Sequence, residues 1–205
     1  MEAQLTDLLD RATAPEEPAG TDPTRERILD AALDEAAAVG LQRMTVEDVV
    51  RRARLGRMTV YRRFARREDL VEALVVRECR RFLSAVADGI AGVDPDEGVA
   101  AAFVAAMRFV REHPLMRRAA TVDPGGVVES VVANDAQLLR MGRGFIATQI
   151  RTADPSISAR RAERVADVYA RLFVTYVAFP PTDPDPNDDK ALWTFADAML
   201  VPLLE

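Results

Sequence analysis

The densest group of side chains that could do chemistry is a run of arginines between residues 43 and 67. Nine arginines lie there against two acids, Glu47 and Asp48, a balance of +7 in a chain whose total formal charge is −6. Guanidinium groups bind phosphates, and a local positive patch is the electrostatic footprint of a nucleic-acid-binding surface. A solvated, charged helix face is the alternative interpretation of the same pattern.

Residue types that catalysis or metal binding would require are scarce. The chain has a single cysteine, Cys79, and a single histidine, His113. One cysteine excludes an internal disulfide framework and a multi-cysteine zinc or iron–sulfur site. The sequence also lacks an HExxH pattern and a glycine-rich phosphate loop of useful form. We therefore predict that the protein is not an enzyme and uses no cofactor and no metal.

The arginine-rich segment needs helices to position it, and the first of these has clear boundaries. Asp22 is a good N-cap, and Pro23 suits the first helical position, where its missing N–H costs nothing. Apolar residues then recur at helical spacing from Ile28 to Val39, and Gly40 can end the helix in a left-handed conformation.

Two short helices follow and carry most of the arginines. The first runs from Thr45, whose side chain can cap it, to Ala53, and the second runs from Arg57 to Phe64. Only three residues separate them. Two helices joined by a tight turn, preceded by a third helix and covered with arginines, are typical of a helix-turn-helix unit that reads the major groove of DNA.

The rest of the chain is also predicted to be helical. Residues 1–21 contain prolines and many acids without sustained periodicity, which favours a flexible acidic tail. Helical spacing begins again at Glu68 and continues through several segments to the C-terminus, interrupted by a proline-rich loop at residues 180–189. Because no segment shows convincing strand alternation, we predict an all-α fold.

The N-terminal quarter resembles the TetR family of bacterial transcriptional regulators. Several motifs occur in the family's order and spacing, and together they cover about fifty residues. They are Arg27-Ile28-Leu29-Asp30-Ala31-Ala32, Gly40, Met44-Thr45-Val46, Asp48-Val49-Val50, Ala53, Thr59-Val60-Tyr61, Phe64 and Arg67-Glu68-Asp69-Leu70. The resemblance implies a helix-turn-helix DNA-binding domain at residues 22–67 and a helical ligand-binding and dimerisation domain at residues 68–205.

The resemblance also implies which residues meet double-stranded DNA. Thr45, Tyr61 and Arg67 match positions at which the family binds phosphates, although the family usually has a lysine where Arg67 stands. An arginine on the recognition helix can pair with guanine, and Met58 or the Thr59 methyl group can touch a thymine methyl. Arg43 and Arg63 are expected to contact phosphates or to be solvated. The predicted DNA-binding residues are Arg43, Thr45, Arg57, Met58, Thr59, Tyr61, Arg62 and Arg67.

Two residues of the turn depart from the family pattern. The turn commonly reads Ala-Gly-Val-Ser in the family, but here it reads Ala53-Arg54-Leu55-Gly56. Arg54 stands where a positive φ is often needed, which is a strained choice for arginine. Gly56 is a tolerated N-cap but provides no side-chain hydrogen bond.

The C-terminal helices are expected to bind an apolar effector and to form a homodimer. Methionine-rich and aromatic linings adapt to varied apolar ligands, although a plain core role is the alternative for each residue. The predicted ligand-binding residues are Phe103, Met107, Val110, His113, Met116, Leu138, Met141 and Phe145. Wide apolar faces on the last two long helices suit a four-helix interface across a two-fold axis, or else fill one protomer's core. The predicted interface residues are Tyr169, Phe173, Tyr176, Leu192, Phe195 and Met199.

Taken together, the sequence predicts a regulator of transcription, with repression through a near-palindromic operator that the effector releases. No apolar run is long enough to suggest a membrane span, and the start lacks the pattern of a signal peptide, so we expect a cytoplasmic protein without a membrane partner. The alternative is a non-enzymatic helical adaptor whose basic patch binds an acidic protein.

Overall fold

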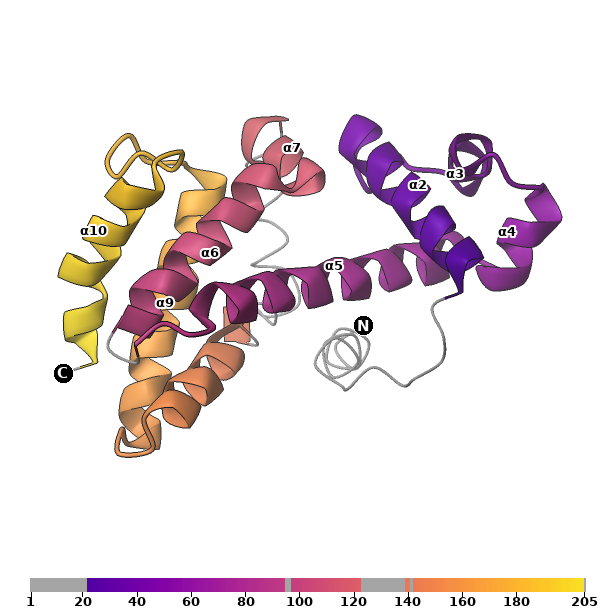
Figure 1. Ribbon diagram of the computed structural model, residues 1–205. Coiled ribbons are helices and arrows are strands. Elements are labelled where there is room, and N and C mark those ends of the chain that lie inside the picture. Colours follow the sequence, from indigo (N-terminus) through magenta and orange to yellow (C-terminus); the bar gives the residue numbers. More distant parts are fainter. Residues whose placement is uncertain (1–21, 95–96, 123–138, 141, 205) are drawn as a thin grey trace. The chain divides into compact units, whose positions relative to one another are not determined.

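The computed structural model describes residues 22–94, 97–122, 139–140 and 142–204, and these residues form helices and loops without a strand (Figure 1). The predicted all-α fold is confirmed. Leu138 and Met141, two of the predicted ligand-binding residues, and the predicted tail at residues 1–21 lie outside the described residues.

The elements are α2 (Pro23–Val39), α3 (Val46–Ala53), α4 (Arg57–Arg63), α5 (Arg67–Ile90), α6 (Gly98–Glu112), α7 (Pro114–Val122), α9 (Ala159–Ala178), α10 (Asp189–Met199) and the 3-10 turn η2 (Val201–Leu203). Residues 142–153 are helical as well.

The chain folds as two compact units that divide within α5, between Arg81 and Phe82. We call residues 22–81 the N-terminal unit and residues 82–204 the C-terminal unit. The predicted functional boundary after residue 67 coincides with the start of α5, and the first half of that helix packs with the N-terminal unit.

The caps predicted for α2 and α3 are present. Asp22 accepts a hydrogen bond from the backbone N–H of Thr24 at 2.9 Å, and Gly40 ends α2 with a φ of 93°. The Thr45 hydroxyl accepts from the backbone N–H of Asp48 at 3.2 Å. These bonds satisfy N–H groups that a helix leaves without a partner in its first turn.

The turn between α3 and α4 has the two unusual features predicted from the sequence. Arg54 adopts a left-handed conformation with φ 53° and ψ 42°, and Gly56 caps α4 without a side-chain hydrogen bond. The left-handed conformation places the Cβ of Arg54 close to the following carbonyl, which costs roughly 1–2 kcal/mol for a residue other than glycine. The packing of α3 and α4 must therefore impose this shape on the turn.

The core of the N-terminal unit is apolar and draws on every helix of that unit. Its largest fully buried side chains come from α2, the following loop, α3, α4 and the first half of α5. They are Ile28, Leu29, Met44, Val49, Val60, Leu70 and Leu74. One side of α4 is therefore held against the other helices, so its opposite side has to face outward.

Ion pairs of the buried Arg77 join α5 to α2 inside this unit. Arg77 is almost fully buried, and its Nη1 lies 2.8 Å from Asp30 Oδ1 and 3.3 Å from Glu26 Oε2. Its Nε donates to Glu78 Oε1 at 2.6 Å. Removing one partner of such a pair leaves a buried charge uncompensated, so these ion pairs specify how the two helices fit together.

The C-terminal unit is built around α6, which contacts the end of α5 on one side. A Cβ placed on Gly89 of α5 would lie 2.5 Å from the Cβ of Ala105, so only glycine allows this close approach. Phe82 of α5 packs against Phe109 of α6 and Phe173 of α9, with ring centroids 5.4 and 5.6 Å apart.

The other side of α6 packs against α9 and α10 (Figure 1). Trp193, the only tryptophan of the chain, is half-buried on α10 and packs against two core clusters, one containing Ala100 and the other Met107 of α6. Asp189 at the start of α10 accepts from Arg108 Nη2 at 2.6 Å and from Arg111 Nη1 at 3.0 Å. Both apolar burial and ion pairs therefore fix α10 on α6.

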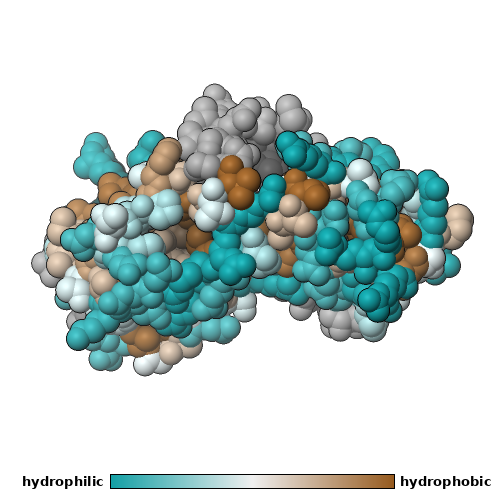
Figure 2. All heavy atoms as spheres, turned by 90° about the horizontal axis from the view of Figure 1, so that it is seen from above, coloured by the Kyte–Doolittle hydropathy of each residue, from teal (hydrophilic) through white to brown (hydrophobic). Residues whose placement is uncertain are grey.

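Hydrophilic residues, drawn in teal, cover most of the face seen in Figure 2, and the hydrophobic residues there form small, separate patches. Among the described residues, no helix combines the length and the apolar character that crossing a membrane requires.

Candidate nucleic-acid interface

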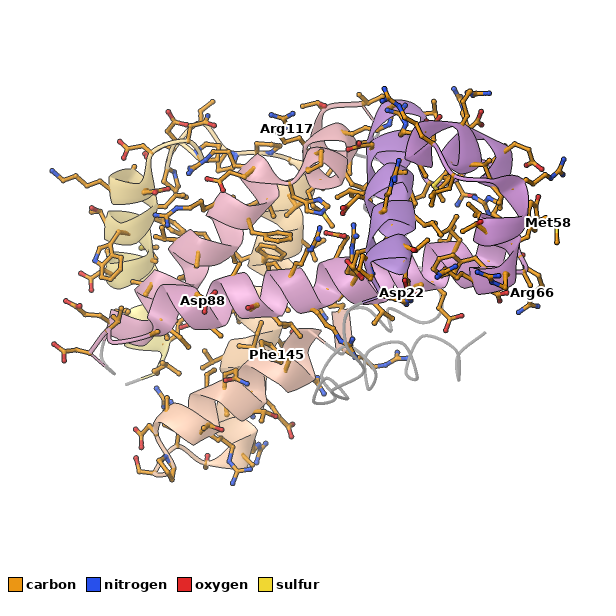
Figure 3. The ribbon with its side chains drawn as sticks, turned by 45° about the vertical axis from the view of Figure 1, so that its right-hand side comes forward. Asp22, Met58, Arg66, Asp88, Arg117 and Phe145 are labelled. Atoms are coloured by element: carbon orange, nitrogen blue, oxygen red, sulfur yellow. The ribbon has the colours of Figure 1, made fainter. Side chains whose placement is uncertain are left out.

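The outward side of α4 presents the residues predicted to read bases. Met58 is 80% exposed, and Figure 3 shows it projecting away from α4. Arg57 and Arg62 are also exposed, and Thr59 is half-buried. Because Val60 is buried on the other side, α4 shows its N-terminal half to solvent, as a recognition helix does when it enters the major groove.

Tyr61 and Arg57 share a partner that the sequence did not reveal. Glu47 Oε1 accepts from the Tyr61 hydroxyl at 2.8 Å and from Arg57 Nη2 at 3.0 Å. The Arg57 guanidinium also lies over the Tyr61 ring, 5.3 Å from its centroid. The hydrogen bond from Tyr61 lowers the pKa of Glu47, so this carboxylate is charged at neutral pH.

Thr45 stands at the start of α3, exposed and engaged with a second carboxylate. Its hydroxyl donates to Asp48 Oδ2 at 2.5 Å while it accepts from the Asp48 backbone N–H. Arg51 forms an ion pair with the same carboxylate. The hydrogen bond from Thr45 holds the pKa of Asp48 below its usual range. The first turn of α3 thus offers phosphate both backbone N–H groups and a competing carboxylate.

Arg67 is half-buried and points its guanidinium at the loop between α2 and α3. Its Nε donates to the carbonyl of Met44 at 2.9 Å, and its Nη2 donates to the carbonyls of Leu41 and, at 3.3 Å, Gln42. Arg43 on the same loop is exposed. The phosphate contact predicted for Arg67 stays a prediction, and the structure adds a role in holding this loop.

Arg63 differs from the expectation of a phosphate contact or a solvated side chain. Its Nε donates to Asp22 Oδ2 at 2.7 Å and its Nη2 to Asp22 Oδ1 at 3.3 Å. The two residues are 41 positions apart, so no local pattern could have indicated the pair. Arg63 therefore ties the end of α4 to the N-cap of α2.

The comparisons with known proteins decide the family. The model of "Bacterial regulatory proteins, tetR family" matches residues 28–74, and that of "Bacterial Tetracyclin repressor, C-terminal domain" matches residues 94–196. The chain belongs to the TetR family. It is a transcriptional regulator of that family, with a helix-turn-helix DNA-binding domain, and TetR regulators are DNA-binding proteins rather than enzymes.

Relatives of this TetR protein agree in sequence and in fold. An uncharacterized HTH-type transcriptional regulator of Mycobacterium tuberculosis is 27% identical over 178 residues, which cover 84% of this chain and 82% of the relative. The TetR family repressor AlkX from Dietzia has a similar structure, with a TM-score of 0.59, 20% identity, and 87% and 98% of the two chains covered. GusR of Salmonella enterica gives a TM-score of 0.65 at 17% identity, with 92% and 99% covered.

The structure distributes the predicted ligand-binding residues over the TetR C-terminal unit. Met107 and Val110 of α6 and the neighbouring His113 are buried, whereas Phe103, Met116 and Phe145 are half-buried. His113 stacks on Phe109 at a centroid distance of 4.9 Å, and its Nδ1 accepts from the backbone N–H of Met116 at 3.3 Å. His113 therefore caps the start of α7 by accepting a hydrogen bond from one of the N–H groups of its first turn.

The predicted interface residues have unequal access to a partner. Leu192 is 0% exposed and packs against Val104 and Met107 within the protomer, so it has no surface to offer a second subunit. The Tyr169 hydroxyl donates to the carbonyl of Leu200 at 2.5 Å, and its ring belongs to the protomer's core clusters. Phe173, Tyr176 and Phe195 are half-buried, and Met199 is 59% exposed.

Within the described residues, no three His, Cys, Asp or Glu side chains are grouped so that they could hold a metal ion.

Proposed function

We propose that the protein is a ligand-responsive repressor that binds a near-palindromic operator as a homodimer and is released by a small, largely apolar effector. The observation that carries the DNA-reading part is the exposed side of α4, where Arg57, Met58 and Arg62 stand together while Val60 anchors the helix in the core. In a dimer bound to such an operator, the two recognition helices lie about 34–36 Å apart, one turn of DNA.

The test is a fluorescence-anisotropy titration against duplexes tiled across the DNA upstream of the protein's own gene, at several salt concentrations. We expect one tile to bind about a thousandfold more tightly than the rest, with a log-log salt slope that reflects several phosphate contacts. Arg62→Ala should weaken binding to that tile about ten- to hundredfold if Arg62 pairs with a guanine. Arg160→Ala, which removes another exposed arginine from α9, is the matched control and should leave the affinity unchanged. Absence of binding at low salt would refute the proposal and favour the adaptor.

The homodimer is supported by apolar side chains that remain exposed on the last elements. Val168 on α9 is 48% exposed, Met199 on α10 is 59% exposed and Leu203 in η2 is 39% exposed. Exposed apolar side chains are typical of surfaces that a partner covers when they form one contiguous patch. We expect sedimentation equilibrium to give a dimer and Met199→Glu to raise its dissociation constant at least tenfold; a monomer at all concentrations would refute the homodimer.

The effector response is supported by the mixed surroundings of His113. This imidazole is buried among apolar residues of α6 and half-buried Met116, and small-molecule sites in proteins are mostly apolar with a few polar groups. A ligand can release DNA only if it binds one state of the protein more tightly than the other. The operator titration repeated with a panel of small apolar compounds tests this, and unchanged operator affinity across the panel would count against the switch.

A further inference from the structure

Glu47 holds two of the predicted DNA-binding side chains at once. One of its oxygens accepts both the Tyr61 hydroxyl at 2.8 Å and Arg57 Nη2 at 3.0 Å. The carboxylate comes from α3 and both donors come from α4, one helical turn apart. The side chains of Glu47 and Arg57 are 55% and 69% exposed, so this cluster lies at the surface where DNA would arrive.

The two donors can respond differently when DNA replaces water. A tyrosine hydroxyl has a single hydrogen, so Tyr61 can donate to a phosphate only after it has released Glu47. Arginine has five N–H donors in a fixed plane, so Arg57 can keep Glu47 on Nη2 and present its other N–H groups to a guanine. A phosphate brought to either side chain also approaches the Glu47 carboxylate and is repelled by it.

Complexes with operator and non-operator DNA differ in these contacts. Non-specific binding consists almost entirely of contacts with phosphates, whereas specific binding adds contacts with base edges. Repulsion between Glu47 and phosphate therefore weakens non-specific complexes most. An Arg57 guanidinium that Glu47 holds in one orientation loses less freedom when it pairs with a base.

We propose that Glu47 is a specificity-determining residue, which disfavours complexes in which Arg57 lies against a phosphate and orients Arg57 in complexes where it reads a base. Glu47 is a positioning residue in this scheme, since it acts through Arg57. The inference rests on the proposed function, because it requires that α4 reads an operator.

The test compares two duplexes and one isosteric variant. One duplex is selected by the wild-type protein from a randomised pool, and the other has the same bases in scrambled order. Glu47→Gln keeps the size of the side chain and removes its charge. We expect it to bind the scrambled duplex about ten times more tightly and the selected duplex within about threefold of wild type, so that the ratio of the two affinities falls. The salt slope on the scrambled duplex should steepen by about one phosphate contact.

Two controls separate this role from a general change of charge. Asp34→Asn removes an exposed carboxylate from α2 and should leave the ratio of affinities unchanged. In an Arg57→Ala, Tyr61→Phe background, Glu47→Gln should change the ratio no more than Asp34→Asn does. Far-ultraviolet circular dichroism checks that each variant is folded.

The outcomes that would overturn the inference are distinct. If the wild-type protein selects an operator and Glu47→Gln leaves the ratio unchanged, Glu47 has no part in specificity while the proposed function stands. If the variant changes the preferred base at one position only, Glu47 itself reads a base, as a carboxylate does when it accepts from cytosine N4. If the wild-type protein selects no sequence, both the proposed function and this inference fail.

Discussion

Replacing Arg67 by alanine should destabilise the N-terminal unit, because the guanidinium holds the loop that precedes α3. Its Nε and Nη2 donate to the carbonyls of Leu41, Gln42 and Met44, and Met44 is itself a fully buried core residue. Without Arg67, the loop loses the bonds that keep Met44 in the core and place Thr45 at the start of α3.

The size of the effect follows from these bonds. A hydrogen bond with a charged donor contributes about 1.5–3 kcal/mol net, and the bonds to Leu41 and Met44 are shorter than the bond to Gln42. Leu41 is half-buried, so water can take over part of what Arg67 supplies there. We therefore expect Arg67→Ala to lower the free energy of unfolding by about 2–3 kcal/mol. Arg67→Lys should lower it by about 1 kcal/mol, since a single ammonium replaces only part of the planar guanidinium.

Urea unfolding followed by far-ultraviolet circular dichroism measures this change. Arg66→Ala is the matched control. The Arg66 guanidinium is 72% exposed and pairs with half-buried Asp69, so its removal should have little measurable effect. The reasoning is refuted if Arg67→Ala leaves stability unchanged and instead weakens operator binding with a salt slope smaller by about one. Arg67 would then be the phosphate contact that the family resemblance implies.

Three further outcomes follow from the structure. Gly89→Ala should lower the free energy of unfolding by about 1–3 kcal/mol in urea, because the new Cβ would lie 2.5 Å from that of Ala105. Adding Ala105→Gly to this variant should restore the stability. An increase in stability on Gly89→Ala would show that α5 and α6 separate freely. Leu192→Ala should lower the free energy of unfolding by about 2–5 kcal/mol through the cavity it leaves. A change in the dimer dissociation constant measured by sedimentation would contradict the burial of Leu192 within the protomer. The hydrogen bond from Arg63 lowers the pKa of Asp22 from 3.8 to about 2. The stability that this ion pair contributes is therefore present above about pH 4 and is lost as the pH falls through 2. As the pH is lowered across this range, the urea midpoint of Asp22→Asn should fall by less than that of wild type.

Local rules were enough to predict most of the fold. The caps at Asp22 and Thr45 and the positive φ of Arg54 all depend on neighbours within a few residues, and the structure has each of them. The start of α5 near Glu68 and the proline-rich loop before α10 were likewise visible as changes of periodicity and composition. Such features are readable from one chain because a helix and its caps satisfy their own backbone.

The polar partners of the candidate interface could not be predicted in this way. Glu47 lies ten residues before Arg57, and Arg67 lies 23 residues after Met44, so only the packing of α3, α4 and α5 brings them together. The C-terminal unit shows the same limit in apolar form. Leu192 and Met199 share a helix and a hydrophobic character, yet one is fully buried in the protomer and the other is mostly exposed.

The position of Trp193 gives the two units different optical signatures. The only tryptophan of the chain, it is half-buried on α10 and packs against the core clusters that α6 and α10 share. Its emission therefore reports the opening of that core, whereas circular dichroism sums the helices of both units. Coincident transitions by the two signals would mean that the units unfold as one cooperative body. A variant such as Arg67→Ala that shifts only the dichroism would show that the DNA-reading unit can melt while the C-terminal unit stays folded.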